Sequence, residues 1–397
     1  MTARQWRKSC SLEAIASLEN LFLAAGKARR GKTRRPDVED WWSHRAQHLG
    51  RLRQTLLAGD WQPGGYHMFE IHDPKRRIIA AAPFEDRVVH HALCNRMAPV
   101  LERRFIARSF SCQIGKGTTA ARDCCRQLTN RHVFVLKCDV RKFFPNIDHA
   151  ILLGKLSRWI ACPGALGLVT KILNSHRTGG EIAAPLFPGD DWIEAAAHPR
   201  GLPIGNLTSQ IWGNFYLDDL DHWVTETQRH GEYLRYTDDF LLFGDDRNRL
   251  WELHEGIVGQ LAGLRLKLAE PKSRLLATRE GVPFCGFRFL PELAPRILGH
   301  TKRRFERRRY ALFARRDLTR LGASVFGWYQ FSREANAEGL RKAYVRWPLA
   351  TRLKRRQRRN PRGQQGGVPT QRSSRAAPAK NPTWTPSNSP QQTPWLD

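Results

Sequence analysis

Two adjacent carboxylates, Asp238 and Asp239, lie between two apolar segments in YLRYTDDFLLFG, residues 233–244. If the two segments pair as a hairpin, both side chains lie at its tight turn and project from a rigid sheet. The rings of Tyr236 and Phe240 flank the pair and would partly remove it from water. Adjacent anions in such a place repel one another unless cations neutralise them. The pattern therefore indicates a cation site, and an ordinary turn that contains Asp is the alternative.

A third carboxylate, Asp139, follows the apolar segment RHVFVLKC at 131–138 and precedes Phe143 and Phe144. A carboxylate at the end of a strand, facing a turn with two more, can hold two hard divalent cations. Mg²⁺ prefers oxygen ligands and keeps positions for substrate phosphates. Two such ions about 3.5–4 Å apart stabilise the attacking and leaving oxygens of a phosphoryl displacement. The structural alternatives are a helix N-cap for Asp139 and core packing for the phenylalanines.

Helical and extended segments surround these carboxylates. Apolar residues at helical spacing predict helices over 11–25, about 38–57 and about 149–173. Residues 66–82 predict two short strands, and residues 232–243 predict a pair of strands around the two adjacent carboxylates. The sequence therefore predicts a mixed fold that places its three carboxylates at strand ends.

The chain is strongly basic. Its 397 residues carry 66 Lys and Arg against 37 Asp and Glu, which gives a formal net charge of +29. A charge of this size favours a polyanionic partner, of which nucleic acid is the commonest, and argues against a small neutral substrate alone. Most of the excess charge lies after residue 300, where 301–320 predicts a basic helix. This helix would follow a phosphate backbone without reading bases.

Other candidate metal ligands are less convincing. The eight cysteines form no C-x-x-C pair, so neither a zinc ribbon nor a redox dithiol is expected. His90 and His91 are adjacent in a predicted helix, where neighbours point about 100° apart and rarely bind one ion. Scattered cysteines predict reduced thiols in a cytoplasmic protein. We expect neither a signal peptide nor a membrane span, because no stretch approaches 18 uncharged apolar residues.

Taken in order, these segments resemble the reverse transcriptases. YTDD resembles the Y-x-D-D signature of that family, and the Asp139 segment resembles its first catalytic motif. The resemblance runs from about residue 20 to about residue 346. Its further segments are DPKRRIIAAAPFEDRVVHHAL (73–93), SFSCQIGKGTTAA (109–121), RGLPIGNLTSQ (200–210), LAEPKS (268–273) and PFCGF (283–287). The resemblance implies an α+β fold with right-hand polymerase architecture: fingers, a palm with an antiparallel sheet, and a helical thumb.

Composition and resemblance together divide the chain into four parts. We expect a helical N-terminal extension at 1–60 and the fingers and palm at 61–295. A basic helical thumb is expected at 296–350. Residues 351–397 form a basic tail rich in Pro, Gly and Ser, which cannot bury a core and should be disordered.

Within the family, three segments resemble the enzymes of diversity-generating retroelements. PFEDRVVHH (83–91) is close to their P-F-R-D-R-V-V-H-H string, with Glu85 in place of Arg. FPGDDW (187–192) lies just ahead of RGLPIGN, and IGNLTSQ (204–210) replaces the Q-G-x-x-x-S-P form of other groups. The alternatives are a defence-type or retron-like reverse transcriptase, and a non-catalytic RNA-binding protein with a polymerase shell.

The resemblance implies a role for each candidate site residue. The catalytic carboxylates hold two Mg²⁺ ions, with Mn²⁺ as a substitute. The predicted metal-binding set is Asp139, Val140, Asp238 and Asp239. The predicted nucleotide-binding set is Arg76, Arg77, Phe144, Ile204, Gly205 and Lys272. The predicted nucleic-acid-binding set is Lys116, Tyr236, Phe284, Gly286, Arg303 and Arg304.

Several of these roles have a physical basis. Arg77, beside Lys75 and Arg76, could clamp a triphosphate, although a solvated basic turn is the alternative. Phe144 resembles a steric gate whose ring would clash with a ribose 2′-OH. Lys272 resembles a lysine that assists pyrophosphate departure. The implied activity is error-prone synthesis of cDNA on an RNA template from dNTPs, with a primer and a small accessory protein as further partners and no membrane.

Overall fold

The computed structural model describes residues 10–72, 76–179, 185–187 and 190–346. These residues form two compact units that divide between Pro295 and Arg296. The predicted tail at 351–397, the first nine residues of the predicted N-terminal extension, and Lys75 lie outside the described residues.

The first unit begins with helices. They are α2 (Leu12–Ile15), α3 (Leu18–Arg29), α4 (Pro36–Ser43) and α5 (Arg45–Ala58), and α3 packs against α6 (Phe84–Leu101). Ser11 and Ser17 cap α2 and α3, because their side chains accept hydrogen bonds from the first-turn amides of Ala14 and Asn20. The buried side-chain amide of Asn20 then donates to the carbonyl of Ala92 at 3.0 Å, which ties α3 to α6.

A four-stranded antiparallel sheet, here called the central sheet, follows these helices. It has the order β4 (Tyr233–Tyr236), β5 (Asp239–Gly244), β3 (Phe134–Asp139) and β6 (Arg274–Ala277). Along β3, Leu136 and Cys138 point into the main core, whereas Lys137 and Asp139 stay partly exposed. This period of two fixes which side chains share the outer face. The antiparallel sheet among many helices confirms the predicted α+β class.

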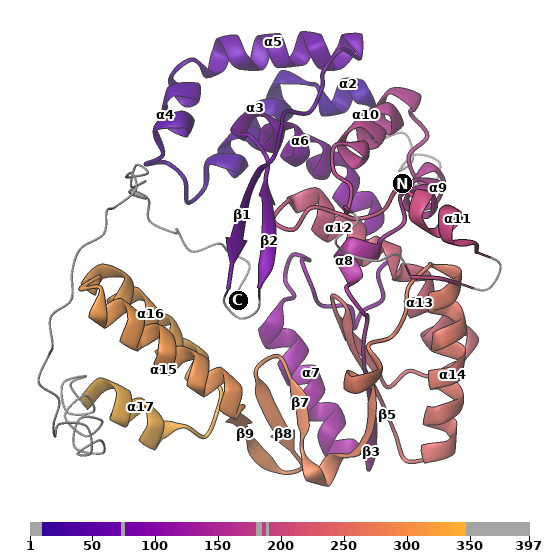
Figure 1. The fold of residues 1–397 in the computed structure, drawn as a ribbon, viewed down its shortest axis with the longest axis vertical. Coiled ribbons are helices and arrows are strands. Elements are labelled where there is room, and N and C mark those ends of the chain that lie inside the picture. The colour runs from indigo at the N-terminus through magenta and orange to yellow at the C-terminus, as the bar shows by residue number, and fades with distance from the viewer. Residues whose placement is uncertain (1–9, 73–75, 180–184, 188–189, 347–397) are drawn as a thin grey trace, which may run out of the picture. The chain divides into compact units, whose positions relative to one another are not determined.

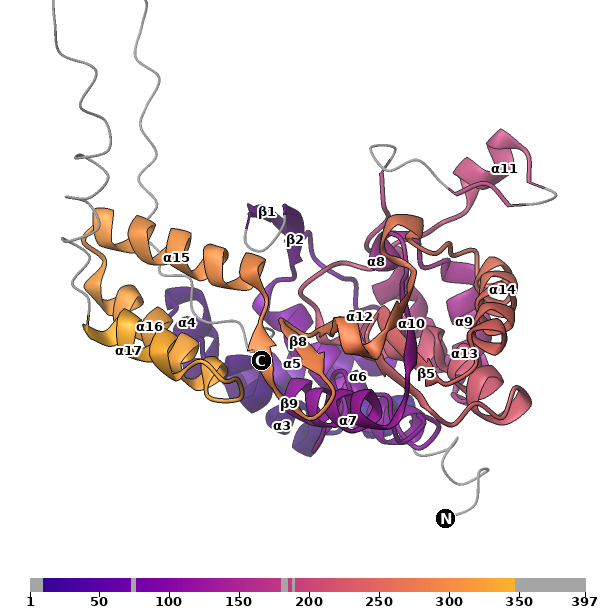
Figure 2. The ribbon, with the colours of Figure 1, turned by 90° about the horizontal axis from the view of Figure 1, so that it is seen from below.

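The described residues also form two smaller sheets and a series of helices (Figures 1 and 2). A hairpin of β1 (His67–Ile71) and β2 (Arg77–Ala81) forms a separate antiparallel sheet, and β7 (Val282–Phe284), β8 (Phe287–Leu290) and β9 (Leu293–Ile297) form a third. The helical elements are α7 (Thr118–Arg131), α8 (Phe143–Asn146), α9 (His149–Ser157), α10 (Pro163–Asn174), α11 (Trp192–Ala197), α12 (Leu207–Tyr216), α13 (Asp218–His222), η1 (Trp223–Thr227), α14 (Arg247–Gly263), η2 (Glu270–Lys272) and η3 (Thr278–Glu280). None of the described helices combines the length and the apolar character that crossing a bilayer requires.

The predicted long helices are each divided in two. The run at 149–173 forms α9 and α10, because Pro163 lacks an amide hydrogen and starts a new helix at its first position. The run at 38–57 forms α4 and α5, which meet at His44. The basic run at 301–320 breaks at Arg316, whose φ of 56° is left-handed and ends the first helix.

The second unit contains three helices, α15 (Gly299–Ala314), α16 (Leu318–Ser332) and α17 (Glu338–Arg346). Aromatic rings make its small core. Phe305 stacks on Trp328 with ring centroids 4.4 Å apart and planes at 5°, and Tyr344 meets Phe305 edge-on at 5.2 Å. Arg309 is buried beside them and donates to the carbonyl of Tyr344 at 3.3 Å. Arg303 is exposed on α15, and Arg304 is half-buried.

His90 gives the first unit a predictable sensitivity to acid. Its ring lies buried in α6, neither ring nitrogen has a hydrogen-bond partner among the described residues, and burial lowers its pKa to about 3. Below pH 6.5 the unfolded chain therefore binds a proton at His90 that the folded chain does not bind. The free energy of unfolding consequently decreases as the pH is lowered. Between pH 7 and 5 this histidine should cost about 2 kcal/mol of unfolding free energy.

Replacing His90 with Leu should remove that loss, so the variant and the wild type should diverge in urea denaturation as the pH falls. The matched change of His44, whose side chain is 61% exposed, should leave the pH profile unchanged. Parallel profiles for wild type and His90→Leu would contradict the assignment.

Candidate active site

The two adjacent carboxylates lie at a tight hairpin turn between β4 and β5. Tyr236 pairs with Asp239, so Thr237 and Asp238 are the two turn residues. Thr237 has a φ of 60°, the left-handed conformation that such a turn requires at its first position. Its hydroxyl donates to the hydroxyl of Ser111 at 2.8 Å, which fixes the turn against the loop before α7. The predicted hairpin is therefore present, with Asp238 in its turn and Asp239 as the first residue of β5.

The third carboxylate is brought to the same place by strand register. Asp139 lies directly opposite Asp239 in the β3–β5 ladder, and the amide of Val140 donates to the carbonyl of Asp238 at 3.1 Å. The pKa of Asp238 is raised to about 6, first by burial and then by the negative charges of Asp139 and Asp239. The structure thus concentrates the predicted metal-binding set at one end of the central sheet.

Two lysines face these carboxylates. Lys272 in η2 donates to Asp139 at 2.5 Å, while Lys137 in β3 contacts both oxygens of Asp239 at 2.7 Å. Within the described part of the chain, no three His, Cys, Asp or Glu side chains form a ready metal cluster. The donor set still fits a hard cation, because carboxylate oxygens are its preferred ligands and because burial, together with the charges of Asp139 and Asp239, raises the pKa of Asp238.

The segment around Lys272 is held to the end of β3 by its backbone. The amide of Ala269 donates to the carbonyl of Asp139 at 2.8 Å, and Lys272 closes the short η2 turn onto Ala269. Lys272 is 46% exposed, so it can leave Asp139 for a ligand. The sequence placed this lysine in the site, whereas Lys137 was missed. Lys137 could have been found from its position two residues before Asp139, because side chains two apart lie on the same face of a strand.

A buried ion pair beneath the turn was also missed by sequence reasoning. Arg235 and Asp221 are both fully buried and paired, and the hydroxyl of Tyr233 donates to Asp221 at 2.7 Å. Arg235 also donates to the carbonyl of Thr237 at 3.0 Å and to the carbonyl of Asn214 at 3.2 Å. The guanidinium therefore fixes the backbone immediately before Asp238.

Comparison with known proteins identifies the family. The pattern of the reverse transcriptase (RNA-dependent DNA polymerase) family matches residues 71–289, which is more than half of the chain. The chain belongs to this family. A protein of Saccharomyces cerevisiae named for intron 1 of COX1/OXI3 is 21% identical over 183 residues. That match covers 45% of this reverse transcriptase-family chain and 20% of the yeast protein, so the chain spans about a fifth of that relative.

Solved structures give weaker likenesses. A telomerase from Candida albicans, in complex with a TWJ fragment of telomeric RNA, matches with a TM-score of 0.40 and 13% identity, covering 62% of this chain and 49% of that one. An apo telomerase from Candida tropicalis matches with a TM-score of 0.39 and 10% identity, covering 57% and 47%. Neither likeness is high enough to inform us about the activity of this reverse transcriptase-family member.

The predicted nucleotide-binding residues come from three elements. Phe144 on α8 is half-buried, and its ring packs tightly against Gly213 of α12, where a Cβ would lie 3.1 Å away. The carbonyl of Ile204 accepts a hydrogen bond from Ala80 of β2 at 3.1 Å. Gly205 follows with a φ of 115°, and a Cβ there would lie 3.1 Å from Ile79. Backbone contact thus joins the RGLPIGN segment of this reverse transcriptase-family chain to the β1–β2 hairpin.

The two predicted triphosphate ligands lie on that hairpin. Arg76 is exposed and forms an ion pair with Glu70 across the hairpin. Arg77 is exposed at the start of β2, opposite Ile71. Both belong to a sheet separate from the carboxylates.

Two of the predicted nucleic-acid-binding side chains are engaged within the protein. Lys116 donates to the carbonyls of Ile106 and Ser109 at 3.2 and 2.8 Å. Phe284 is 1% exposed, so its ring packs in the core. Gly286 has a φ of 87° in the β7–β8 turn, and Tyr236 is half-buried at the end of β4.

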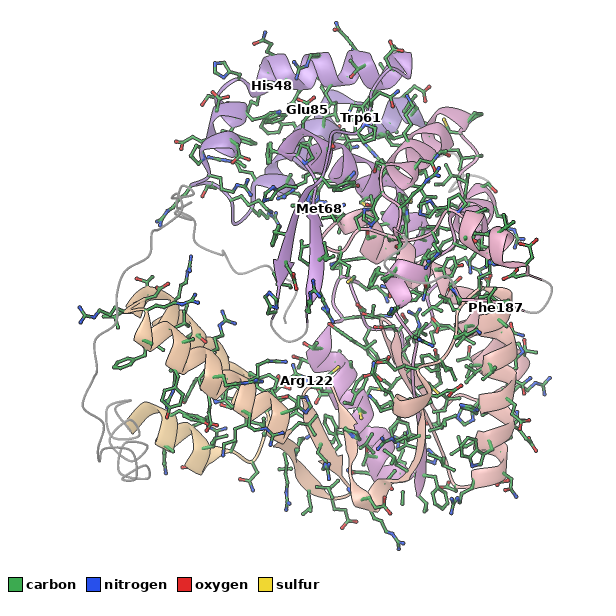
Figure 3. All side chains as sticks on the ribbon, in the orientation of Figure 1. His48, Trp61, Met68, Glu85, Arg122 and Phe187 are labelled. Carbon is green, nitrogen blue, oxygen red and sulfur yellow. The ribbon has the colours of Figure 1, made fainter. Side chains whose placement is uncertain are left out.

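Glu85, which stands where the similar retroelement segment has Arg, forms polar contacts with the N-terminal helices. Glu85 of α6 accepts from the indole of Trp41 at 3.2 Å and from Arg51 at 2.9 Å, with His48 at 3.8 Å (Figure 3). Glu85 therefore joins α6 to α4 and α5. An Arg at position 85 would be repelled by Arg51. The acidic side chain instead attracts Arg51, which suits the N-terminal helices of this reverse transcriptase-family member.

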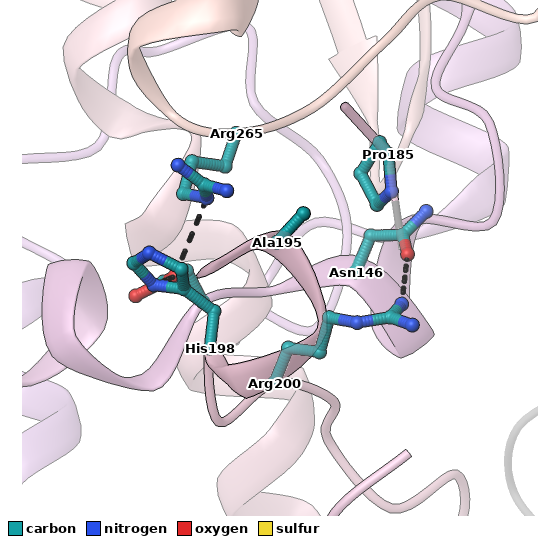
Figure 4. A pocket seen from close by; sticks show the side chains of 7 residues that line it. Asn146, Pro185, Ala195, His198, Arg200 and Arg265 are labelled. Carbon is teal, nitrogen blue, oxygen red and sulfur yellow. Dashed lines mark hydrogen bonds and ion pairs between the residues drawn. The ribbon is translucent and has the colours of Figure 1, made fainter. Parts of the chain in front are cut away.

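A small polar pocket anchors the segment that contains FPGDDW (Figure 4). Asp190 accepts two hydrogen bonds from Arg265, at 2.9 and 2.7 Å. Beside them, His198 pairs with the buried Asp148 at 3.0 Å, and Arg200 donates to Asn146 at 2.6 Å. Through its two hydrogen bonds to Asp190, Arg265 holds this described residue of the segment in place.

Proposed function

We propose that this chain is an RNA-directed DNA polymerase that synthesises cDNA from dNTPs on an RNA template. The observation that carries the proposal is the register of the central sheet. It sets Asp139 opposite Asp239 and places Asp238 in the adjoining turn, in a chain that belongs to the reverse transcriptase family. The resulting concentration of negative charge is what a site for two divalent cations requires.

The proposed metal site consists of Asp139, Asp238 and Asp239, with Val140 beside them, and holds two Mg²⁺ ions, with Mn²⁺ as a substitute. When bound, the ions stabilise the attacking and leaving oxygens of nucleotidyl transfer. Lys272 releases Asp139 and turns toward the pyrophosphate that leaves, as its exposure allows. Arg235 and Ser111 hold the turn in place from below and from the side.

Nucleotide selection is assigned to the surfaces around this site. Phe144 acts as the gate against a ribose 2′-OH, and its close packing on Gly213 supports a fixed ring position. Arg76 and Arg77 supply positive charge to the triphosphate from the β1–β2 hairpin. Ile204 and Gly205 border the base pair that forms.

Template and primer binding is assigned to basic residues of α15 and to residues at turns. Arg303 and Arg304 on α15 contact the phosphate backbone, so binding should weaken steeply with salt. Tyr236 and Gly286 lie at turns and approach the primer end. Lys116 and Phe284 act by shaping their loops, because the first is bonded to backbone carbonyls and the second is buried.

Primer extension tests the function directly. The purified chain is mixed with an RNA template, an annealed DNA primer, dNTPs and Mg²⁺, and we expect cDNA that fails to form when EDTA is present. Template binding without any extension, by a folded wild-type protein, would favour the non-catalytic RNA-binding alternative.

We further infer a cytoplasmic enzyme of a diversity-generating retroelement, for which the resemblance implies error-prone synthesis and a small accessory protein. PFEDRVVHH, FPGDDW and IGNLTSQ support this subtype through their resemblance to that group. Sequencing the DNA that flanks the gene tests it. A template repeat beside a variable repeat is expected, whereas a non-coding RNA operon would favour a retron-like or defence-type enzyme.

Fidelity should depend on Ile204. A Gln at this position would offer an amide that hydrogen-bonds near the forming base pair, whereas Ile is stiff and apolar. Ile204→Gln should lower the error rate about tenfold, which corresponds to about 1.4 kcal/mol of added discrimination. The resemblance to the enzymes of diversity-generating retroelements implies that the largest effect falls at template adenines. The hydrogen bond from the Ala80 amide to the carbonyl of residue 204 involves only backbone atoms, so it should be kept in the variant.

The measurement is deep sequencing of cDNA made on a template that contains all four bases. Ile193→Gln serves as the control, because Ile193 is 79% exposed on α11. An unchanged error spectrum in an active Ile204→Gln enzyme would remove Ile204 from the mechanism.

A further inference from the structure

Lys137 contacts two segments that lie far from it in the sequence, Asp239 in β5 and Pro283 in β7. Its ammonium contacts both carboxylate oxygens of Asp239 at 2.7 Å and donates to the carbonyl of Pro283 in β7 at 3.1 Å. An ammonium has three donors, and these three acceptors use all of them. The ring of Phe284 lies 5.8 Å from the same nitrogen. Lys137 is therefore a fully satisfied contact between Asp239 and the β7–β8 hairpin.

This contact is sheltered from water. The side chain of Lys137 is 16% exposed and that of Asp239 is 27% exposed. A pair at this depth is screened less than a surface pair, so removing either partner leaves a charge with poor solvation. Burial raises the pKa of Asp239, and the ammonium of Lys137 opposes that rise.

The hairpin that Lys137 contacts is rigid. Phe284 pairs with Phe287, which leaves Cys285 and Gly286 as a two-residue turn with φ values of 42° and 87°. Two left-handed residues in succession define a tight turn whose twist matches that of its strands. Phe284 and Phe287 are both buried, so their packing anchors the hairpin. The carbonyl of Pro283 therefore holds the ammonium of Lys137 in place, and this ammonium in turn holds the carboxylate of Asp239.

We propose that Lys137 is a positioning residue that locks the carboxylate of Asp239 to the β7–β8 hairpin, so that the metal-binding end of the central sheet and the hairpin beside the primer keep one relative placement. The proposal rests on the proposed function for the identity of the site. It assigns Lys137 a role through Asp239 and Pro283, without contact to the reacting atoms.

A double-mutant cycle in metal-free protein tests the lock. Lys137→Met and Asp239→Asn should each lower the melting temperature, and the double variant should lose clearly less than the sum of the two. Lys267→Met is the matched control, because the Lys267 side chain is exposed and its ammonium lies over the ring of Phe187, 5.3 Å from the ring centroid. Additive losses, or a Lys137→Met protein that melts like the control, would overturn the proposal.

Kinetics separate positioning from simple stabilisation. Rates are measured per active site at saturating Mg²⁺, so that misfolded protein does not count. Lys137→Met should lower kcat about tenfold or more and raise KM for the primer–template several-fold, because both ends of the contact become loose. Unchanged kcat and KM per active site would reduce Lys137 to a structural residue. If the wild type extends no primer, the proposed function fails, while the melting cycle still decides whether the lock exists.

Discussion

Replacing Asp238 with Asn should reduce primer extension at least a thousandfold. Asp238 is the carboxylate whose pKa is raised to about 6 by burial and by Asp139 and Asp239, so it lies where negative charge is most concentrated. An amide of the same shape removes one charge from the proposed cation site without changing the turn. A loss of about 4 kcal/mol in transition-state stabilisation corresponds to that rate change. The measurement is single-nucleotide extension under saturating Mg²⁺ and dNTP.

Binding of the RNA–DNA duplex should be retained by the Asp238→Asn protein, because the carboxylate repels phosphate rather than attracting it. Asp123→Asn is the matched control, since Asp123 is 56% exposed on α7 in an ion pair with Arg126. This control should extend primers at the wild-type rate. Extension by Asp238→Asn within tenfold of wild type would exclude the two-metal assignment.

Replacing Asp221 with Asn should destabilise the first unit by about 3–5 kcal/mol. Both Asp221 and Arg235 are fully buried, and their side chains are paired. The substitution leaves the guanidinium charged in a site without water, and it weakens the acceptor of the Tyr233 hydroxyl. Urea denaturation measures the loss, provided that the transition of the first unit is resolved from that of the second.

The comparison variant is Glu252→Gln, which breaks an ion pair with Arg249 whose partners are 66% and 41% exposed. This exposed pair should contribute less than about 1 kcal/mol. Equal losses in the two variants would mean that the Asp221–Arg235 pair contributes no more than a surface pair.

The elements predicted best are those specified by neighbouring residues. The hairpin around Asp238 and the strand that ends at Asp139 follow from short apolar segments bounded by carboxylates. The division of four predicted helices, at 11–25, 38–57, 149–173 and 301–320, was missed. Two of these cases show why, because helical spacing continues across Pro163 and across the left-handed Arg316. A proline or a turn residue can break a helix while the apolar pattern carries on through it.

The contacts around the site could not be predicted from local pattern. Lys137 meets a carbonyl 146 residues later in the chain, and Asn214 donates to Ser111, which lies 103 residues earlier. Such pairs depend on which faces the finished fold brings together. Lys116 and Phe284 were assigned to nucleic acid by motif, whereas the structure engages one in backbone hydrogen bonds and buries the other.

The contacts that hold the turn also determine when the carboxylates can assemble while the polypeptide is being translated. Thr237 is held by Ser111 ahead of α7, by Arg235 in β4 and, through Arg235, by Asp221 in α13. A growing chain that has released only its first two hundred residues has the β3 carboxylate but neither the turn nor its buried counter-ion. Because such non-local contacts form late, the acidic residues assemble only when the first unit closes. A nascent polypeptide on the ribosome would therefore lack the assembled carboxylates before that stage.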